Sequence, residues 1–181
     1  MIEPTGKLLN FADFRKYSDT FIESGSCYGS GIDKAIEADY TDIRSVEAYA
    51  PHYDHCKVKY KGTNIKLWFG LSQDKMPEML ADINKPAVVW LDAHVSGKDS
   101  AGHDEVNGAK PEYQQHIILM KELEIILNHR TDHVIILDDQ IGDDSQKYVD
   151  FILSKNANYK FYFYDELRER LHKNKVLACI P

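Results

Sequence analysis

A glycine-rich stretch between two short apolar runs constrains the fold of this chain more than any other feature. Residues 20–22 are largely apolar and predict the end of a buried strand. Gly25, Gly29 and Gly31 follow, and residues 32–38 have the composition of a helix. Glycine allows a tight backbone turn and the close approach of a ligand, while the N-terminus of a helix presents free N–H groups. A strand, a glycine-rich turn and a helix in this order predict a corner that binds an anion or a nucleotide.

Two acidic residues flank this corner and narrow the choice of ligand. Glu23 lies two residues before the first glycine, and Glu47 ends a second predicted strand, residues 42–46. βαβ units that bind nucleosides place an acid against the ribose hydroxyls about 20 residues after the glycine turn. A carboxylate at Glu23 would repel a pyrophosphate but suits a ligand that carries an ammonium group. An ordinary tight turn would show the same glycines, and the paired acids argue against that simpler interpretation.

The spacing of these residues, E-x-G-x-x-x-G-x-G, resembles motif I of the class I S-adenosylmethionine-dependent methyltransferases. Residues 21–26 (FIESGS), 45–47 (SVE) and 90–97 (WLDAHVSG) are also similar, in this order, to a group of short bacterial and phage methyltransferase-like proteins. The resemblance implies that S-adenosylmethionine is the cofactor. The cofactor-binding residues that it implies are Glu23, Gly25, Ser26, Gly29 and Gly31 for the methionine part, Glu47 for the ribose, Ser72 and Gln73 beside the adenine, and Asp92.

Seven apolar runs are the predicted strands, and five of them alternate with helices before a final pair. The run at residues 86–91 is the most hydrophobic, as expected for a central strand that is buried on both faces. The alternation implies a doubly wound, Rossmann-like α/β fold with a mostly parallel sheet. The methyltransferase resemblance implies that the last strand runs antiparallel. The seven runs are residues 20–22, 42–46, 65–69, 86–91, 133–137, 159–164 and 175–180.

Composition disfavours several classes of protein. The 181 residues suffice for one domain with a single covered core, residues 1–181, and we expect a helical cap at residues 1–19. A net charge of -7 argues against a nucleic-acid partner. The sequence shows neither an apolar stretch of membrane-spanning length nor the apolar core of a signal peptide, and its three cysteines are far apart. These features predict a cytoplasmic protein with free thiols and no membrane partner.

Acidic residues follow two strands that are expected to be neighbours in the sheet. Asp92 follows the fourth predicted strand, and Asp138 and Asp139 follow the fifth. Three carboxylates in one crevice repel one another unless protons or a cation compensate, and oxygen ligands suit Mg²⁺, Ca²⁺ or Mn²⁺. The resemblance implies a metal site of Asp92, Asp138 and Asp139, as in catechol-like and sugar O-methyltransferases. A helix cap, or a turn at Gly142, would explain Asp138 or Asp139 equally well.

His94 stands where the metal-dependent sugar methyltransferases carry a catalytic base, although theirs is an aspartate. An imidazole titrates near neutrality and can accept a proton from a hydroxyl, while a metal ligand or a buried, hydrogen-bonded histidine are the alternatives. The polar loop at residues 95–110 is the predicted substrate lid. Residues 50–60 contain histidines and Cys56, but their spacing matches no standard zinc pattern and predicts a solvated helix.

The residues and the resemblance together predict methyl transfer from S-adenosylmethionine to a hydroxyl of a small molecule. Asp92 and His94 are the predicted catalytic residues, with possible assistance from Mg²⁺ or another divalent cation. Three alternatives stay open, namely a cofactor-binding module without catalysis, a nicotinamide-dependent oxidoreductase and a hydrolase with a carboxylate-bound metal. The glycine spacing and Glu23 disfavour the oxidoreductase. A homo-oligomer is compatible with each of these functions.

Overall fold

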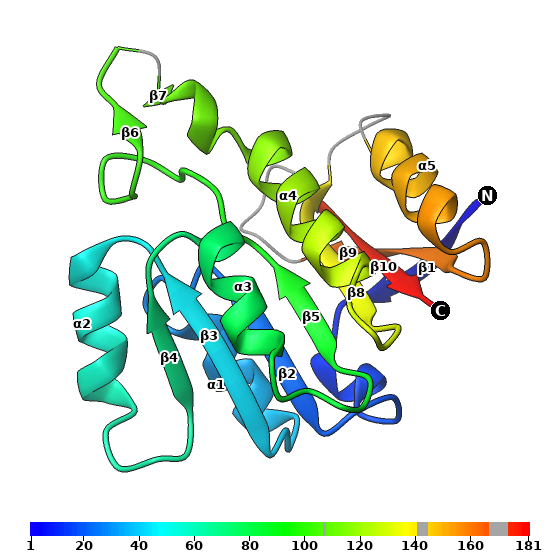
Figure 1. The fold of residues 1–181 in the computed structure, drawn as a ribbon, viewed down its shortest axis with the longest axis horizontal. Helices are drawn as coiled ribbons and strands as arrows, with labels where there is room; N and C mark the ends of the chain where they lie inside the picture. Colours follow the sequence, from blue (N-terminus) through cyan, green and yellow to red (C-terminus); the bar gives the residue numbers. More distant parts are fainter. Residues whose placement is uncertain (107, 141–144, 167–173) are drawn as a thin grey trace.

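The computed structural model describes residues 1–106, 108–140, 145–166 and 174–181, and at its centre is one mostly parallel sheet (Figure 1). In the described part of the chain this sheet has eight strands, in the order β1-β9-β10-β8-β5-β2-β3-β4. Strand β10 runs antiparallel to both of its neighbours, while the other pairs are parallel. The predicted Rossmann-like α/β fold with an antiparallel last strand is therefore confirmed.

Helices connect the strands, and a small hairpin lies outside the main sheet. The strands of the main sheet are β1 (Ile2–Leu8), β2 (Thr20–Ser24), β3 (Asp42–Glu47), β4 (Lys66–Phe69), β5 (Val88–Leu91), β8 (Val134–Gln140), β9 (Lys160–Glu166) and β10 (Asn174–Ile180). The helices are α1 (Ser30–Glu37), α2 (Ala50–Lys59), α3 (Ser72–Leu80), α4 (Gln115–Leu127) and α5 (Gln146–Lys155), with the short 3₁₀ turns η1 (Phe11–Phe14) and η2 (Pro111–Tyr113). The hairpin consists of β6 (His103–Asp104) and β7 (Gly108–Ala109).

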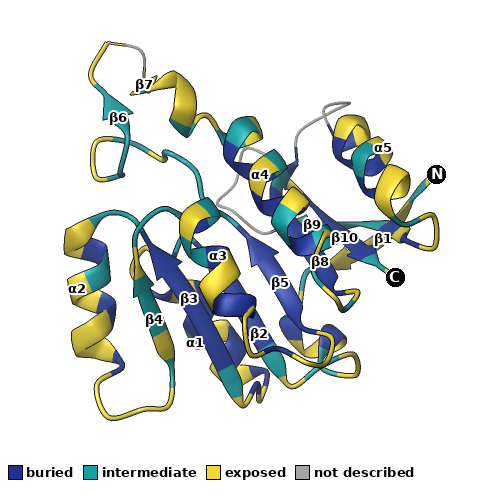
Figure 2. Ribbon diagram, viewed as in Figure 1, coloured by how far each residue is buried: buried dark blue, intermediate teal, exposed yellow. Residues whose placement is uncertain are grey.

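The helices cover both faces of the sheet, because the side chains of each strand alternate between two apolar cores. In β5, Val88 and Trp90 point into one core, and Val89 and Leu91 point into the other. Helices α3, α4 and α5 contribute to the core that contains Val89, whereas α1, α2 and η1 contribute to the core that contains Val88. All of β5 is buried, as a central parallel strand requires, and Figure 2 shows this burial along the middle of the sheet.

Parallel pairing brings the carboxyl ends of the central strands to one edge of the sheet. Strand β2 lies between β3 and β5, and Ser24 at its end is opposite both Val46 and Leu91. The loops that follow these three strands therefore leave the sheet side by side. In open α/β sheets this edge is where ligands bind.

The N-terminal segment differs from the helical cap predicted for residues 1–19. Its first part is the strand β1, which pairs in parallel with β9 and adds an eighth strand to the seven predicted. Its apolar residues Phe11 and Phe14 are buried in the short turn η1. The edge of β9 offers backbone hydrogen bonds that β1 can use although most of its side chains stay exposed. A strand that is held by backbone pairing with few buried side chains cannot be predicted from the pattern of apolar residues.

Two expectations from composition can be compared with the structure. Within the described residues, no helix combines the length and the apolar character that crossing a bilayer requires. The three cysteines are free thiols, as predicted, with Cys27 exposed and Cys56 and Cys179 buried. The two buried cysteines act as small apolar residues of the cores.

A buried arginine joins the start of β3 to the end of α3 and provides a test of this packing. Arg44 is 3% exposed, forms ion pairs with Asp42 and Asp82, and donates to the carbonyl oxygen of Met79 over 2.6 Å. Arg44→Met keeps an apolar stem but loses these bonds, and we expect it to lower the free energy of unfolding by about 2 kcal/mol. Arg15→Met, which removes a surface pair with Asp19, should cost less than about 1 kcal/mol. Urea denaturation of both variants checks this, and equal losses would contradict it.

Candidate active site

A cavity of about 250 Å³ lies at the carboxyl edge of β2, β3, β4 and β5. Its wall comes from the loops that follow these four strands, together with residues of the predicted lid and of α4. Several of the residues singled out in the sequence meet in this wall, although they are far apart along the chain. They are Gly25, Glu47, Ser72, Gln73, Asp92 and His94.

The glycine turn is held in place by the neighbouring strand. Gly25 has a left-handed backbone with φ of 87°, and a Cβ atom there would lie 2.8 Å from the carbonyl oxygen of Asp92. The amides of Gly25 and Ser26 donate to the carbonyl oxygen of Val46 over 2.9 and 3.2 Å. These hydrogen bonds fix the turn against β3. Because Gly25 has no side chain, a ligand can approach the backbone closely at this point.

Glu47 is the acid that faces the cavity. One carboxylate oxygen accepts from the amide of Cys27 over 2.7 Å, and the other accepts from the amide of Tyr49 over 2.8 Å. The residue is buried and lines the cavity. A carboxylate offers about four acceptor positions, so both oxygens can still accept from the hydroxyls of a ligand. The two hydrogen bonds from backbone amides therefore orient the Glu47 carboxylate and leave further acceptor positions for a ligand.

Glu23 lies behind the cavity wall and is not one of its lining residues. It is 1% exposed, and the hydroxyl of Ser45 donates to its carboxylate over 2.6 Å. A Cβ atom on Gly31 would lie 1.8 Å from its other oxygen, so the carboxyl group packs against the start of α1. Burial raises the pKa of Glu23 to about 8. We assign Glu23 to the support of the turn, because the alternation of β2 directs it toward α1.

The other predicted turn residues also lie outside the lining of the cavity. The hydroxyl of Ser26 is 2.6 Å from that of Ser45, which connects it to Glu23. Gly29 has φ of 83° and caps the start of α1, and the hydroxyl of Tyr60 donates to its carbonyl oxygen over 2.8 Å. Of the five residues predicted to hold the methionine part, the structure thus places Gly25 in the lining and the rest in the support beneath it.

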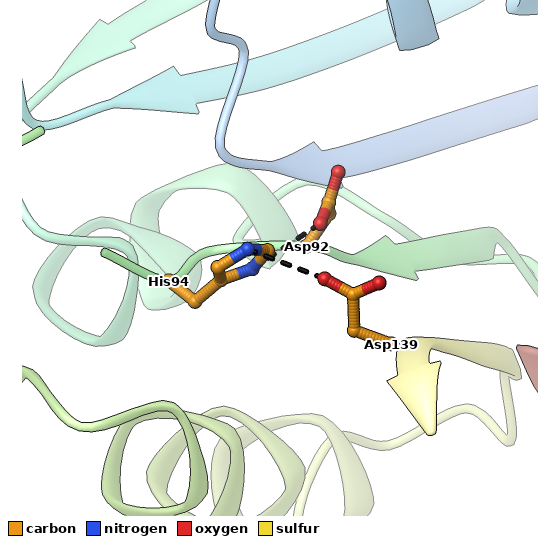
Figure 3. Close-up of side chains that lie close together, drawn as sticks. All are labelled: Asp92, His94 and Asp139. Atoms are coloured by element: carbon orange, nitrogen blue, oxygen red, sulfur yellow. Dashed lines mark ion pairs between the residues drawn. The ribbon is translucent and has the colours of Figure 1, made fainter. Parts of the chain in front are cut away.

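At one end of the cavity, Asp92 and His94, which follow β5, lie close to Asp139 of the neighbouring strand β8 (Figure 3). His94 lies between two aspartates, with Nδ1 3.4 Å from Oδ1 of Asp92 and Nε2 3.3 Å from Oδ2 of Asp139. All three side chains are partly buried. A positive charge on the imidazole would be stabilised by both carboxylates. The group can therefore take up a proton or surround a cation.

The donor atoms also fit a divalent metal. Among the described residues, Asp92, His94 and Asp139 each offer one ligand atom, and these atoms lie within 4.8 Å of one another. The predicted set contained Asp138 instead of His94. Asp138 is fully buried within β8, whereas Asp139 is partly buried and has a left-handed backbone with φ of 50°, where the pairing of β8 with β10 is irregular. The alternative turn at Gly142 lies outside the described residues.

Comparison with known proteins was made at the level of sequence and of structure. No protein-family model and no curated protein sequence matches this chain. The O-methyltransferase from Bacillus cereus in complex with SAH is 13% identical, with a TM-score of 0.58 over 95% of this chain and 80% of its own. The O-methyltransferase TomG from Streptomyces achromogenes in complex with SAM is 14% identical, with a TM-score of 0.56 over 94% and 77% of the two chains. The ribosomal protein L11 methylase from Lactobacillus delbrueckii subsp. bulgaricus is 14% identical, with a TM-score of 0.52 over 89% and 68%.

This chain has the fold of the class I S-adenosylmethionine-dependent methyltransferases. The resemblance seen in its motifs is confirmed at the level of the fold. The place of the antiparallel strand β10, between β8 and β9, accords with that fold.

Sequence reasoning did not place His52 among the residues of the cavity. His52 is 7% exposed, lines the cavity, and packs between the rings of Tyr28 and Tyr49 with ring centroids 4.5 and 5.0 Å away. Its Nε2 atom makes no hydrogen bond to any residue that the structure describes. The predicted solvated helix is present as α2, most of whose residues are exposed, and within it His52 and Cys56 are buried. Helix α2 begins three residues after Glu47, so its first turn lies near the cavity. This short spacing in the sequence could have indicated that His52 lines the cavity.

The predicted lid contains the hairpin of β6 and β7 and contributes Val95, Ser96, Ser100 and Ala101 to the cavity wall. Figure 1 shows this segment extending away from the sheet above α2 and α3. Tyr113, at the end of η2, packs its ring against Gly102 and also lines the cavity. The segment is therefore placed to contact whatever occupies the polar end of the cavity.

The buried carboxyl group of Glu23 predicts how stability depends on pH. Its pKa is about 8 in the folded protein, against a usual value of 4.5. Between these values the folded protein binds more protons than the unfolded chain, so stability falls as the pH rises. We expect Glu23→Gln to reduce this loss by more than about 1 kcal/mol between pH 5 and 8. Thermal unfolding across that range checks the slope, with Glu37→Gln on the exposed end of α1 as the control. A slope unchanged by Glu23→Gln would contradict the assignment.

Proposed function

We propose that this protein is an S-adenosylmethionine-dependent methyltransferase that acts on a hydroxyl group of a small molecule. One observation carries the proposal. A single cavity at the carboxyl edge of a methyltransferase fold is lined by the glycine turn, by Glu47, by Ser72 and by the Asp92–His94 pair. Each of these groups has a distinct use toward a sulfonium nucleoside and an acceptor beside it.

The residues of the chain divide into those that bind and those that handle a proton. Gly25 provides a surface that a ligand can approach closely, and Glu47 accepts from the ribose hydroxyls. Ser72 and Gln73, at the start of α3, face the adenine, and the buried Oε1 of Gln73 has no hydrogen-bond partner among the described residues. His52 supplies a further unpaired nitrogen to the same wall. These unpaired polar atoms fit a polar ligand.

The chemistry requires orientation and the removal of one proton. When bound, S-adenosylmethionine supplies a methyl group already activated by its sulfonium, so the acceptor oxygen forms a bond to carbon as the carbon–sulfur bond breaks. His94, held between Asp92 and Asp139, accepts the proton of the acceptor hydroxyl, and both carboxylates stabilise the resulting charge. A divalent metal at Asp92 and Asp139 would instead lower the pKa of the hydroxyl, with His94 as a third ligand.

Separate observations support a small molecule as the methyl acceptor. Two of the structurally similar proteins are named as O-methyltransferases, while a third is named as a ribosomal protein methylase. The net charge of -7 disfavours a nucleic acid as the acceptor. The lid segment contributes four residues to the cavity wall, so a compact acceptor in the cavity would contact it.

Calorimetric titration of the full-length protein with S-adenosylmethionine tests the cofactor. We expect binding by the wild type, and at least about tenfold weaker binding by Glu47→Ala, because hydrogen bonds to a charged acceptor are lost. Glu37→Ala, which removes an exposed acid outside the cavity, serves as the matched control and should bind as the wild type does. Binding of NADH in place of S-adenosylmethionine, or full affinity in Glu47→Ala, would overturn the proposal.

Measurement of metal binding tests whether Asp92, His94 and Asp139 form a metal site. Carboxylates combined with an imidazole suit Mn²⁺ better than Mg²⁺, whereas carboxylates alone suit both. We expect Mn²⁺ to bind more tightly than Mg²⁺ in the absence of any acceptor. Electron paramagnetic resonance of free Mn²⁺ measures the first affinity, and displacement of bound Mn²⁺ by Mg²⁺ measures the second. His94→Ala should weaken Mn²⁺ binding at least about tenfold, on the scale by which residues that support a metal site act. If neither ion binds, the metal is removed from the proposal and His94 remains as the base, whereas unchanged Mn²⁺ binding by His94→Ala would remove His94 from the set of ligands.

A further inference from the structure

A glutamate is buried in the apolar core behind the cavity wall. Glu122, in the middle of α4, is 0% exposed, and Leu119, Leu123 and Ile126 of the same helix are buried around it. Neither of its carboxylate oxygens makes a hydrogen bond of regular geometry to any residue that the structure describes. A carboxyl group in such surroundings is costly, so packing alone does not explain it.

The groups that face Glu122 belong to the wall of the site. Burial raises its pKa to about 7, the nearby hydroxyls of Ser72 and Ser24 oppose this increase, and the charge of Asp92 adds to it. A neutral carboxyl group can both donate and accept a hydrogen bond. It can therefore satisfy two hydroxyls at once with small rotations of the side chains.

Ser72 and Ser24 act at two different places in the site. Ser72 begins α3 and lines the cavity, where the adenine is proposed to lie. Ser24 ends β2, and its hydroxyl accepts from the amide of Asp92 over 3.3 Å. Ile118, one turn before Glu122 on α4, also lines the cavity. Glu122 thus lies one layer behind both the adenine side and the catalytic side.

We infer that Glu122 is a positioning residue, whose carboxyl group orients the hydroxyl of Ser72 toward the cofactor and that of Ser24 behind Asp92. The inference rests on the proposed function, since it assigns a purpose to the same cavity. Glu122 does not line the cavity and takes no part in the reaction itself. Its effect passes through the two serines.

Cofactor affinity and stability of full-length Glu122 variants separate positioning from packing. Glu122→Leu fills the space without polar atoms, so we expect binding of S-adenosylmethionine to weaken about three- to tenfold. Its melting temperature should be equal to or higher than that of the wild type, because the cost of burying a carboxyl group in an apolar core is removed. Glu122→Gln keeps a donor and an acceptor and should restore the affinity. Glu124→Leu, at an exposed position of the same helix, is the matched control and should change neither.

A double-mutant cycle with Ser72 tests whether Glu122 acts on cofactor affinity through the hydroxyl of Ser72. Ser72→Ala should weaken binding in the wild type but have little further effect in Glu122→Leu, because residues that act through one another are not additive. Independent losses, or unchanged affinity in Glu122→Leu, would overturn the inference. Should Glu122→Leu fail to fold, Glu122→Met tests the same loss of hydrogen bonding. If the wild type does not bind S-adenosylmethionine, the proposed function falls together with the inference, whereas intact binding by Glu122→Leu removes the inference alone.

Discussion

Parallel pairing of β2 with two neighbours is the interaction on which the site depends. Because Ser24 is opposite both Val46 and Leu91, the three strands end at the same level. Backbone bonds then continue past the strand ends, from the amide of Gly25 to Val46 and from the amide of Asp92 to Ser24. The turn at Gly25, Glu47 and the Asp92–His94 pair are thereby held at fixed separations by main-chain hydrogen bonds, which no side-chain substitution can easily displace.

Buried acids lie beneath this edge on both faces of the sheet. Glu23 points toward α1 and is held by Ser45, while Glu122 of α4 lies on the opposite side, behind Ser24. Burial raises the pKa of each, to about 8 for Glu23 and about 7 for Glu122. Such groups cost stability and specify orientation. The site is thus supported from below by polar groups that are not in contact with the cavity.

The sequence predicted more of the cavity than of its supports. Glu47 was identified from its distance to the glycine turn, and Asp92 and His94 from their position after a buried strand, and the structure places all three in one wall. Glu23 was predicted to bind the ligand, and the structure places it behind the lining of the cavity, against the start of α1. His52 was assigned to a solvated helix because its own helix is polar, and its ring contacts with Tyr28 and Tyr49 come from tertiary packing. Local patterns do not contain those long-range contacts.

Hydrophobic periodicity by itself determined the seven predicted strands, their alternation with helices and hence the doubly wound architecture, because each strand needs apolar residues on the faces it buries. The tertiary structure alone decided that residues 2–8 add an edge strand, that His94 rather than Asp138 joins Asp92 and Asp139, and that Glu122 lies behind the cavity. These outcomes depend on backbone pairing and on side-chain directions between elements distant in sequence. Hydrophobic periodicity indicates which residues are buried. Which residues they contact depends on the packing of the whole fold.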